Sequence, residues 1–155
     1  MLPALFIKLN LDLNADGPYG TVIDIGANDS SLLSKFPMAR RVAVDPNASG
    51  DAELIKEYVE NANLTEFAGL RKIILCSHTL EHLKDPLKVL VHLRGMMGHA
   101  DACAFQFPSL DSLVRDARID QVHHQHLHYF SLRATSLLLA KAGFQIFAHE
   151  FDDSH

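Results

Sequence analysis

Histidine is the residue type whose number and placement in this sequence first suggest chemistry. The chain has 155 residues and contains ten histidines. Six of them flank apolar runs in two short segments: His78, His82, His123, His124, His126 and His128. A neutral imidazole has a pKa near physiological pH, so it can accept a proton as a general base or ligate a metal ion. We expect the two segments to meet at one edge of the fold.

General-base chemistry is the interpretation that we favour for this cluster. His126 is the first choice for the base, with His82 and His123 as its partners. Gln125 cannot ionise, so it can orient a substrate or a water molecule but cannot share a proton. His78 follows the end of an apolar run and is expected to face the substrate.

Metal binding is the alternative for the same residues. His124 and His126 alternate, so in an extended segment they would point to one side. Together with His128 and Glu81 they could ligate zinc or another divalent ion. A third interpretation makes several of these histidines surface or packing residues with satisfied ring nitrogens. We predict no metal ligands and keep the metal site as the alternative.

The elements that position these side chains alternate between strand and helix patterns. Continuous apolar runs predict strands over 21–25, 41–45, 71–77, 102–107 and 144–149, with a weaker strand near 58–61. Helical spacing, caps and stops predict helices over 30–36, 85–98, 110–118 and 131–143, after an amphipathic N-terminal helix. Ser30 or Ser31 would cap the first of these four, and Asp85 and Ser131 would cap the second and the last.

Strands that are apolar throughout their length are typical of a parallel sheet with both faces covered. The predicted fold class is therefore α/β, a Rossmann-like doubly wound and mostly parallel sheet with helices on both faces. We expect one domain over residues 1–155, with a helix and loop at 1–20 and a tail at 150–155.

Polar residues and a glycine turn follow the first two predicted strands. Gly26 allows a close approach of the backbone to a ligand. Asp45 comes about 20 residues later, where an acid can accept hydrogen bonds from ribose hydroxyls. The turn lacks the further glycines of the G-x-G-x-x-G pattern, which disfavours NAD and FAD. S-adenosylmethionine carries no phosphate and does not need that pattern.

The motifs also resemble those of a known family. VIDIGANDSSLL followed by VAVDP looks like the first two motifs of class I S-adenosylmethionine-dependent methyltransferases. IILCS with HTLEHLKDPLKVL resembles their fourth strand and the helix after it, and FQFPSLDSL resembles the fifth strand and its exit. The run HHQHLHYFSLRATSLLLAKAGFQIF is similar to the end of this domain in the sugar C-methyltransferase branch, where a histidine is the proposed base. The resemblance covers roughly residues 21–147.

The resemblance implies a residue set for S-adenosylmethionine. Gly26 would lie against the methionine moiety with Asp24 and Asn28 nearby, and Asp45 would hold the ribose. Pro46, Asn63 and Leu64 would edge the adenine. Ser77 and His78 would face the methionine and the substrate.

The sequence departs from this branch at several positions. Ser30 replaces a glycine and is accommodated if its φ is negative. His123 replaces a tyrosine and Gln125 replaces a glutamate, whereas His126 is retained. The cysteine-rich zinc domain before the fold and the further domain after it are absent from the sequence. The acceptor is therefore not carried over.

Three functions remain open at this point. The first is S-adenosylmethionine-dependent methyl transfer to a small-molecule acceptor, with a carbon of a sugar nucleotide and a histidine base as its specific form. The second is a non-catalytic or partner-dependent domain that only binds the cofactor. The third is a metal-dependent hydrolase that uses the histidine cluster.

Composition limits the partners. The net charge of −5 leaves no basic field for nucleic acid, and no apolar run has the ~18 residues of a membrane span. Cys76 and Cys103 each lie in an apolar run, which favours buried free thiols and a cytoplasmic location. We expect a small-molecule acceptor as the partner, and leave a homodimer or a partner chain open.

Overall fold

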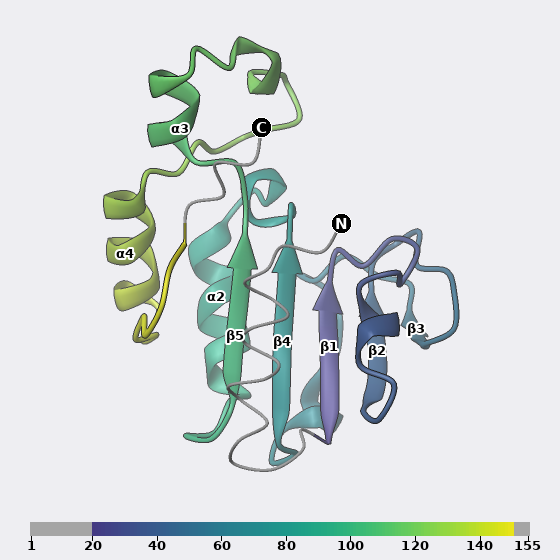
Figure 1. Ribbon diagram of the computed structural model, residues 1–155. Helices are drawn as coiled ribbons and strands as arrows, with labels where there is room; N and C mark the ends of the chain where they lie inside the picture. Colours follow the sequence, from purple (N-terminus) through teal and green to yellow (C-terminus); the bar gives the residue numbers. More distant parts are fainter. Residues whose placement is uncertain (1–19, 151–155) are drawn as a thin grey trace.

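The computed structural model describes residues 20–150. One parallel sheet of five strands forms its centre, in the order β3-β2-β1-β4-β5 (Figure 1). The strands are β1 (Thr21–Ile25), β2 (Arg40–Val44), β3 (Glu53–Ile55), β4 (Lys72–Ser77) and β5 (Ala102–Gln106). The sheet confirms the predicted α/β class and the parallel arrangement. The predicted N-terminal helix and most of the predicted tail lie outside the described residues.

The strand order changes direction at β1. The chain runs outward from β1 through β2 to β3, and then returns to the other side of β1 to form β4 and β5. In open parallel sheets, ligands bind beyond the carboxyl ends of the strands at such a switch. A ligand site is therefore expected at the carboxyl ends of β1 and β4.

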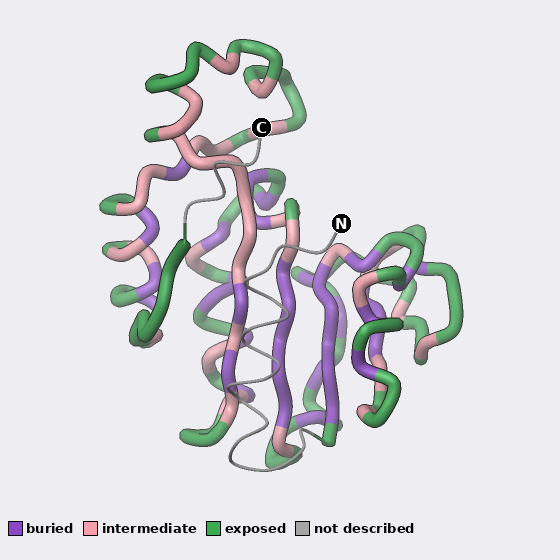
Figure 2. The backbone as a smooth tube through the Cα atoms, in the orientation of Figure 1, coloured by how far each residue is buried: buried purple, intermediate pink, exposed green. Residues whose placement is uncertain are grey.

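The two faces of the sheet carry separate apolar clusters, because successive strand residues point to opposite sides. On one face, Ile23 and Ile74 pack with Leu90 and Leu93. On the other, Val22, Ile73 and Leu75 pack with residues of the segment after β1, among them Leu33 and Phe36. Figure 2 shows β1 and β4 buried along their length, whereas the region after β5 is much more exposed.

Three α-helices frame the sheet: α2 (Pro86–Gly95), α3 (Leu110–Arg115) and α4 (Leu132–Lys141). In Figure 1, α2 lies behind the sheet, α4 lies beside it, and α3 lies beyond the carboxyl ends of the strands. The predicted caps of two helices are confirmed. The Asp85 carboxylate accepts a hydrogen bond from the Lys88 amide, and the Ser131 hydroxyl accepts one from the Ala134 amide. Within residues 20–150, no helix has the length and apolar character to cross a bilayer.

Several boundary predictions are wrong. The weak strand lies at Glu53–Ile55 rather than near 58–61, because its pairing with β2 comes earlier in the chain. Residues 144–150 form no strand, and Phe147 is 66% exposed. The segment after β1 contains only the 3-10 turn η2 (Leu33–Lys35), which begins after Leu32 and has no side-chain cap. α2 ends at Gly95, three residues before the predicted stop, because the chain leaves the helix at Met96.

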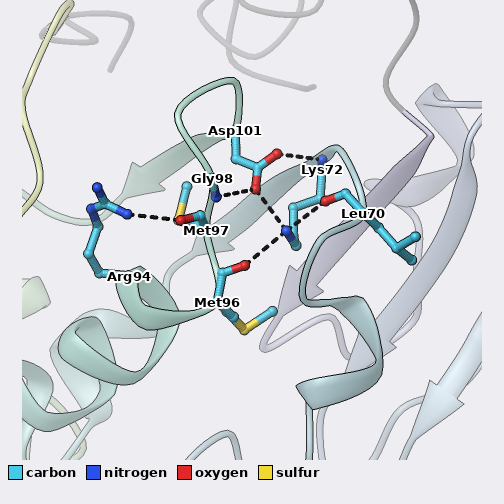
Figure 3. A network of polar contacts seen from close by, with 7 residues as sticks. All are labelled: Leu70, Lys72, Arg94, Met96, Met97, Gly98 and Asp101. Carbon is cyan, nitrogen blue, oxygen red and sulfur yellow. Dashed lines mark hydrogen bonds and ion pairs between the residues drawn. The ribbon is translucent and has the colours of Figure 1, made fainter.

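A buried lysine ties the amino ends of β4 and β5 to the end of α2 (Figure 3). The Lys72 side chain is completely buried, and its ammonium donates to the Asp101 carboxylate at 2.7 Å. It also donates to the carbonyls of Leu70 at 2.7 Å and Met96 at 3.0 Å. Because the ammonium lowers the energy of the neighbouring carboxylate, the pKa of Asp101 is held below its usual value, although burial opposes this. This network lies at the amino ends of the strands, whereas the ligand site is expected at their carboxyl ends.

Candidate active site

The turn after β1 approaches the segment after β4 very closely. Gly26 has φ +79°, and a Cβ at this position would overlap the Thr79 hydroxyl. That hydroxyl donates to the carbonyl of Ile25 at 3.1 Å. The glycine is therefore required by contact within the protein, in addition to any close approach of a ligand. Thr79, which the sequence did not single out, joins the two strand ends at the switch.

The turns after β1 and β2 are connected to each other. Asn28 and Ser30 both have positive φ, at 47° and 60°. The Asn28 carbonyl accepts a hydrogen bond from the Ser49 amide at 2.8 Å, and the Ser30 hydroxyl donates to the Ser49 carbonyl. The condition stated for accommodating Ser30, a negative φ, is not met. The serine keeps the left-handed conformation that a glycine would adopt, and its hydroxyl bonds to the neighbouring turn.

Asp24 carries a buried carboxyl group directly before this turn. The residue is 3% exposed. Burial, together with the negative charges of Asp45 and Asp29, raises the pKa of its carboxyl to about 7. No hydrogen bond from the described residues lowers it. A cation placed beside this carboxyl would stabilise its charged form.

The end of β2 presents a second carboxylate. Asp45 is half-buried, and its Oδ1 accepts a hydrogen bond from the Asn47 amide at 2.7 Å. This contact fixes the side chain through one oxygen. Its other oxygen makes no such contact within the described residues, so it can accept hydrogen bonds from a ligand. Pro46 follows it and is also half-buried.

The two residues expected at the adenine edge differ in exposure. Asn63 is exposed, and its Oδ1 accepts hydrogen bonds from the Thr65 amide at 3.1 Å and hydroxyl at 2.7 Å. Leu64 is 1% exposed and belongs to the core cluster. Leu64 therefore offers no surface to an adenine in this conformation, whereas Asn63 does.

The exit of β4 places Ser77 and His78 at the same edge of the sheet. The Ser77 hydroxyl donates to Oε1 of Gln106 at 2.9 Å, and the His78 amide donates to the Gln106 carbonyl at 2.8 Å. His78 has φ +50°, and its side chain is 58% exposed. The serine hydroxyl is thus engaged with β5, and the imidazole of His78 remains accessible.

The two histidine segments meet as expected. η4 (Leu80–His82) is the 3-10 turn that follows β4, and the Glu81 carbonyl accepts hydrogen bonds from the Leu127 and His128 amides. The rings of His82 and His126 lie 4.9 Å apart between centroids, and those of His123 and His126 lie 3.8 Å apart. His126 is half-buried, whereas His82 and His123 are exposed. Three of the predicted catalytic residues therefore form one cluster.

Backbone carbonyls orient two of these rings. Nδ1 of His82 lies 2.8 Å from the Gln125 carbonyl, and Nδ1 of His126 lies 3.0 Å from the Gln121 carbonyl. A carbonyl oxygen only accepts, so Nδ1 carries the proton in each ring and Nε2 has the lone pair when the ring is neutral. Gln125 acts here through its backbone, and its side chain is exposed.

His123 is an exposed member of the cluster. Loss of contact with water lowers the pKa of its imidazole, and the neighbouring imidazoles of His126, His124 and His82 lower it further. The Tyr129 hydroxyl donates to the His123 carbonyl at 3.4 Å.

The metal set considered from the sequence is not the one that the structure brings together. Residues 124–125 form a turn, and the His126 amide donates to the His123 carbonyl. The segment is therefore not extended, and the expected alternation of His124 and His126 is wrong. Nε2 of His128 contacts the Leu83 carbonyl at 2.9 Å and so points elsewhere.

Glu81 lies beneath the cluster and is 2% exposed. Among the described residues, neither carboxylate oxygen has a hydrogen-bond partner. Its nearest charged neighbour is Nδ1 of His78, 3.5 Å from Oε1, which is an ion-pair distance only if that ring is protonated. Within residues 20–150, Lys84 forms no ion pair with this carboxylate.

Comparison with known proteins identifies the family. A family model described as a methyltransferase domain matches residues 4–149. The fold is similar to that of a SAM-dependent methyltransferase from Thermotoga maritima, described as a possible histamine N-methyltransferase. The TM-score is 0.65 at 14% identity, over 92% of this chain and 77% of that chain.

A second similar structure is the plantazolicin methyltransferase BpumL in complex with SAH. The TM-score is 0.63 at 16% identity, over 87% of this chain and 59% of that chain. This chain therefore spans less than two thirds of that enzyme. Identities this low establish a shared fold, and no curated protein matches the sequence. The family model matches nearly the whole chain, and the chain belongs to the methyltransferase-domain family.

Proposed function

We propose that this chain transfers a methyl group from S-adenosylmethionine to a small-molecule acceptor. The observation that carries the proposal is the buried carboxyl of Asp24 beside the Gly26 turn, at the strand switch where ligands of such sheets bind. S-adenosylmethionine, when bound, supplies an electrophilic methyl group on a sulfonium. The SAH in the similar plantazolicin methyltransferase supports this choice of cofactor.

The residues at the strand ends fit the groups of this cofactor. Asp24 offers a carboxylate to an ammonium group, which would offset the cost of ionising a buried carboxyl. Asp45 offers its remaining oxygen to ribose hydroxyls. Asn28, Pro46, Asn63 and Ser77 would complete the contacts, with Asn63 at the exposed adenine edge.

The histidine cluster would handle the acceptor. The ring of His126 has its Nδ1 proton held by the Gln121 carbonyl, so Nε2 is free to accept a proton from the acceptor. His82, His123 and His78 would surround the acceptor, and Gln125 would lie at the rim. Holding the nucleophile in line with the methyl group would supply much of the rate enhancement.

We further propose that the acceptor is a sugar nucleotide methylated on carbon. The support for this narrower form is the likeness of residues 123–147 to the closing segment of the sugar C-methyltransferase branch, in which His126 is retained. A carbon nucleophile requires removal of a proton next to a carbonyl, which a neutral imidazole can perform.

A turnover assay tests the proposal. The untagged chain would be incubated with S-adenosylmethionine bearing an isotope-labelled methyl group and a panel of ketone-bearing sugar nucleotides. SAH release with a new carbon–methyl signal in the acceptor is the expected result. Methyl transfer to oxygen or nitrogen would retain the methyltransferase and reject the carbon acceptor. Cofactor binding without turnover across the panel would favour the binding-only domain.

A further inference from the structure

The buried carboxylate of Glu81 has no role in the methyl-transfer proposal, yet it lies beside two rings of the histidine cluster. A carboxylate oxygen of Glu81 and a ring nitrogen each of His82 and His126 all lie within 4.8 Å of one another. We propose that these three residues bind a divalent transition-metal ion, with Zn²⁺ as the reference case.

The carboxylate of Glu81 is the strongest argument for a cation. Glu81 is 2% exposed, and both of its oxygens are buried without a hydrogen-bond partner in the described region. Buried polar groups are nearly always satisfied, and an isolated buried charge is costly. A metal ion between this carboxylate and the two rings supplies the missing partner. His78 does not, because its Nδ1 lies 3.5 Å away on a side chain that is 58% exposed.

The two rings are already held as metal ligands usually are. In each, Nδ1 donates to a backbone carbonyl, that of Gln125 for His82 and that of Gln121 for His126. Histidines that ligate metals almost always donate their second ring nitrogen to such an acceptor, which fixes the ring and its tautomer. This arrangement assigns Nε2 of both rings as the ligand atoms.

Two imidazoles and one carboxylate favour Zn²⁺ and related ions over Mg²⁺ or Ca²⁺, which prefer oxygen ligands. Ligand atoms of a tetrahedral zinc site lie about 3.3 Å apart, given metal–ligand bonds of about 2 Å. The ligand atoms lie within 4.8 Å of one another, so loading the site requires their separations to shrink by at most roughly 1.5 Å. His82 is exposed, so its ring can make this movement.

The position of this metal site links it to the methyl acceptor. Glu81 comes two residues after Thr79, whose hydroxyl bonds to the end of β1 beside the proposed cofactor position. Three protein ligands leave a fourth position open for water or for an oxygen of the acceptor. This part of the inference rests on the proposed function. It changes the role of His126 from base to ligand, and favours an acceptor that presents a hydroxyl or carbonyl oxygen.

Metal binding can be tested without cofactor or acceptor. The untagged, metal-depleted chain would be titrated with ZnCl2 by calorimetry and with CoCl2 by visible absorption. We expect one equivalent to bind, with the absorption of a Co²⁺ ion in a low-coordinate site. Glu81→Gln, His82→Ala and His126→Ala should each weaken the affinity at least 10-fold. His92→Ala, on the exposed side of α2, is the matched control and should bind as the unmodified chain does.

Two results would overturn the site: no stoichiometric binding by the unmodified chain, or binding that His82→Ala leaves unchanged. If the Glu81 or His126 variant does not fold, the metal affinity of the His82 variant is the deciding measurement. His82 is exposed, so its replacement leaves the core intact. Binding of S-adenosylmethionine is measured separately, so failure of the metal site leaves the proposed function standing, and the reverse also holds.

Discussion

The Thr79 hydroxyl donates a hydrogen bond to the carbonyl of Ile25 at 3.1 Å, in the space that a side chain at Gly26 would occupy. This contact links the end of β1 to the segment that follows β4 at the strand switch. It brings the glycine turn and the histidine cluster to the same edge of the sheet.

Gly26→Ala should therefore destabilise the protein by about 3 kcal/mol or more, since it adds a steric overlap to the strain of a positive φ. Gly69 provides a matched control, because it has the same φ of +79° but a Cβ there would meet no atom within 4 Å. Gly69→Ala should cost only about 1–2 kcal/mol. Urea unfolding of both variants measures the difference, and equal losses would show that Thr79 does not restrict this position.

Asp24 should make the stability of the protein depend on pH. Its pKa is about 7 in the folded state and near its ordinary value of 3.8 in the unfolded chain. Between these values the folded state keeps a proton that the unfolded state loses, so the free energy of unfolding falls as pH rises and levels off above about pH 7. The upper limit of this loss is about 4 kcal/mol, at about 1.4 kcal/mol per pKa unit.

Asp24→Asn should flatten this profile and raise stability at about pH 8 relative to the unmodified chain. Asp51→Asn, which alters an exposed carboxylate, is the control and should leave the profile unchanged. Unfolding in urea at about pH 5 and about pH 8 gives the comparison. An unchanged profile in Asp24→Asn would assign the dependence to another group.

The Lys72 network should be essential to the stability of the protein but should not affect cofactor binding at the carboxyl ends of the strands. Lys72→Met removes the ammonium from a buried carboxylate and two carbonyls, and should cost about 3–5 kcal/mol. Lys88→Met, on the exposed surface of α2, should change stability by less than about 0.5 kcal/mol. Thermal unfolding of the two variants provides the test, and a small loss for Lys72→Met would contradict the role of the network.

Much of the fold could be predicted from the sequence because four of the five strands are apolar along most of their length. β1, β2, β4 and β5 begin and end within one residue of their expected bounds. β3 could not be placed, since Glu53 and Leu54 are exposed and give no burial pattern. Phe144–His149 has a strand-like composition, but within residues 20–150 it pairs with no strand. Family membership confirms the methyltransferase prediction.

The candidate site could be predicted only in part. The meeting of the two histidine segments follows from their places after a strand and before a helix. The sequence predicts His126 and His82 as members of the cluster. For the metal alternative, the replacement of His124 and His128 by His82 depends on a turn at 124–125 and on contacts with backbone carbonyls, which residue types do not reveal. The burial of the Glu81 carboxylate without a hydrogen-bond partner likewise depends on packing, which the sequence does not reveal. Ser30 shows the same limit, because its left-handed backbone depends on a contact with the turn after β2.

Calorimetric titration of the untagged chain with S-adenosylmethionine and SAH measures whether the strand switch binds this cofactor. We expect both to bind, and Asp45→Asn to weaken binding at least 10-fold through the lost ribose hydrogen bonds, since charged hydrogen bonds contribute about 1.5–3 kcal/mol each. Asp51→Asn, which alters an exposed carboxylate paired with Arg41, should bind as the unmodified chain does. No binding by the unmodified chain, or equal binding by Asp45→Asn, would show that the cofactor is not held at the strand switch through Asp45.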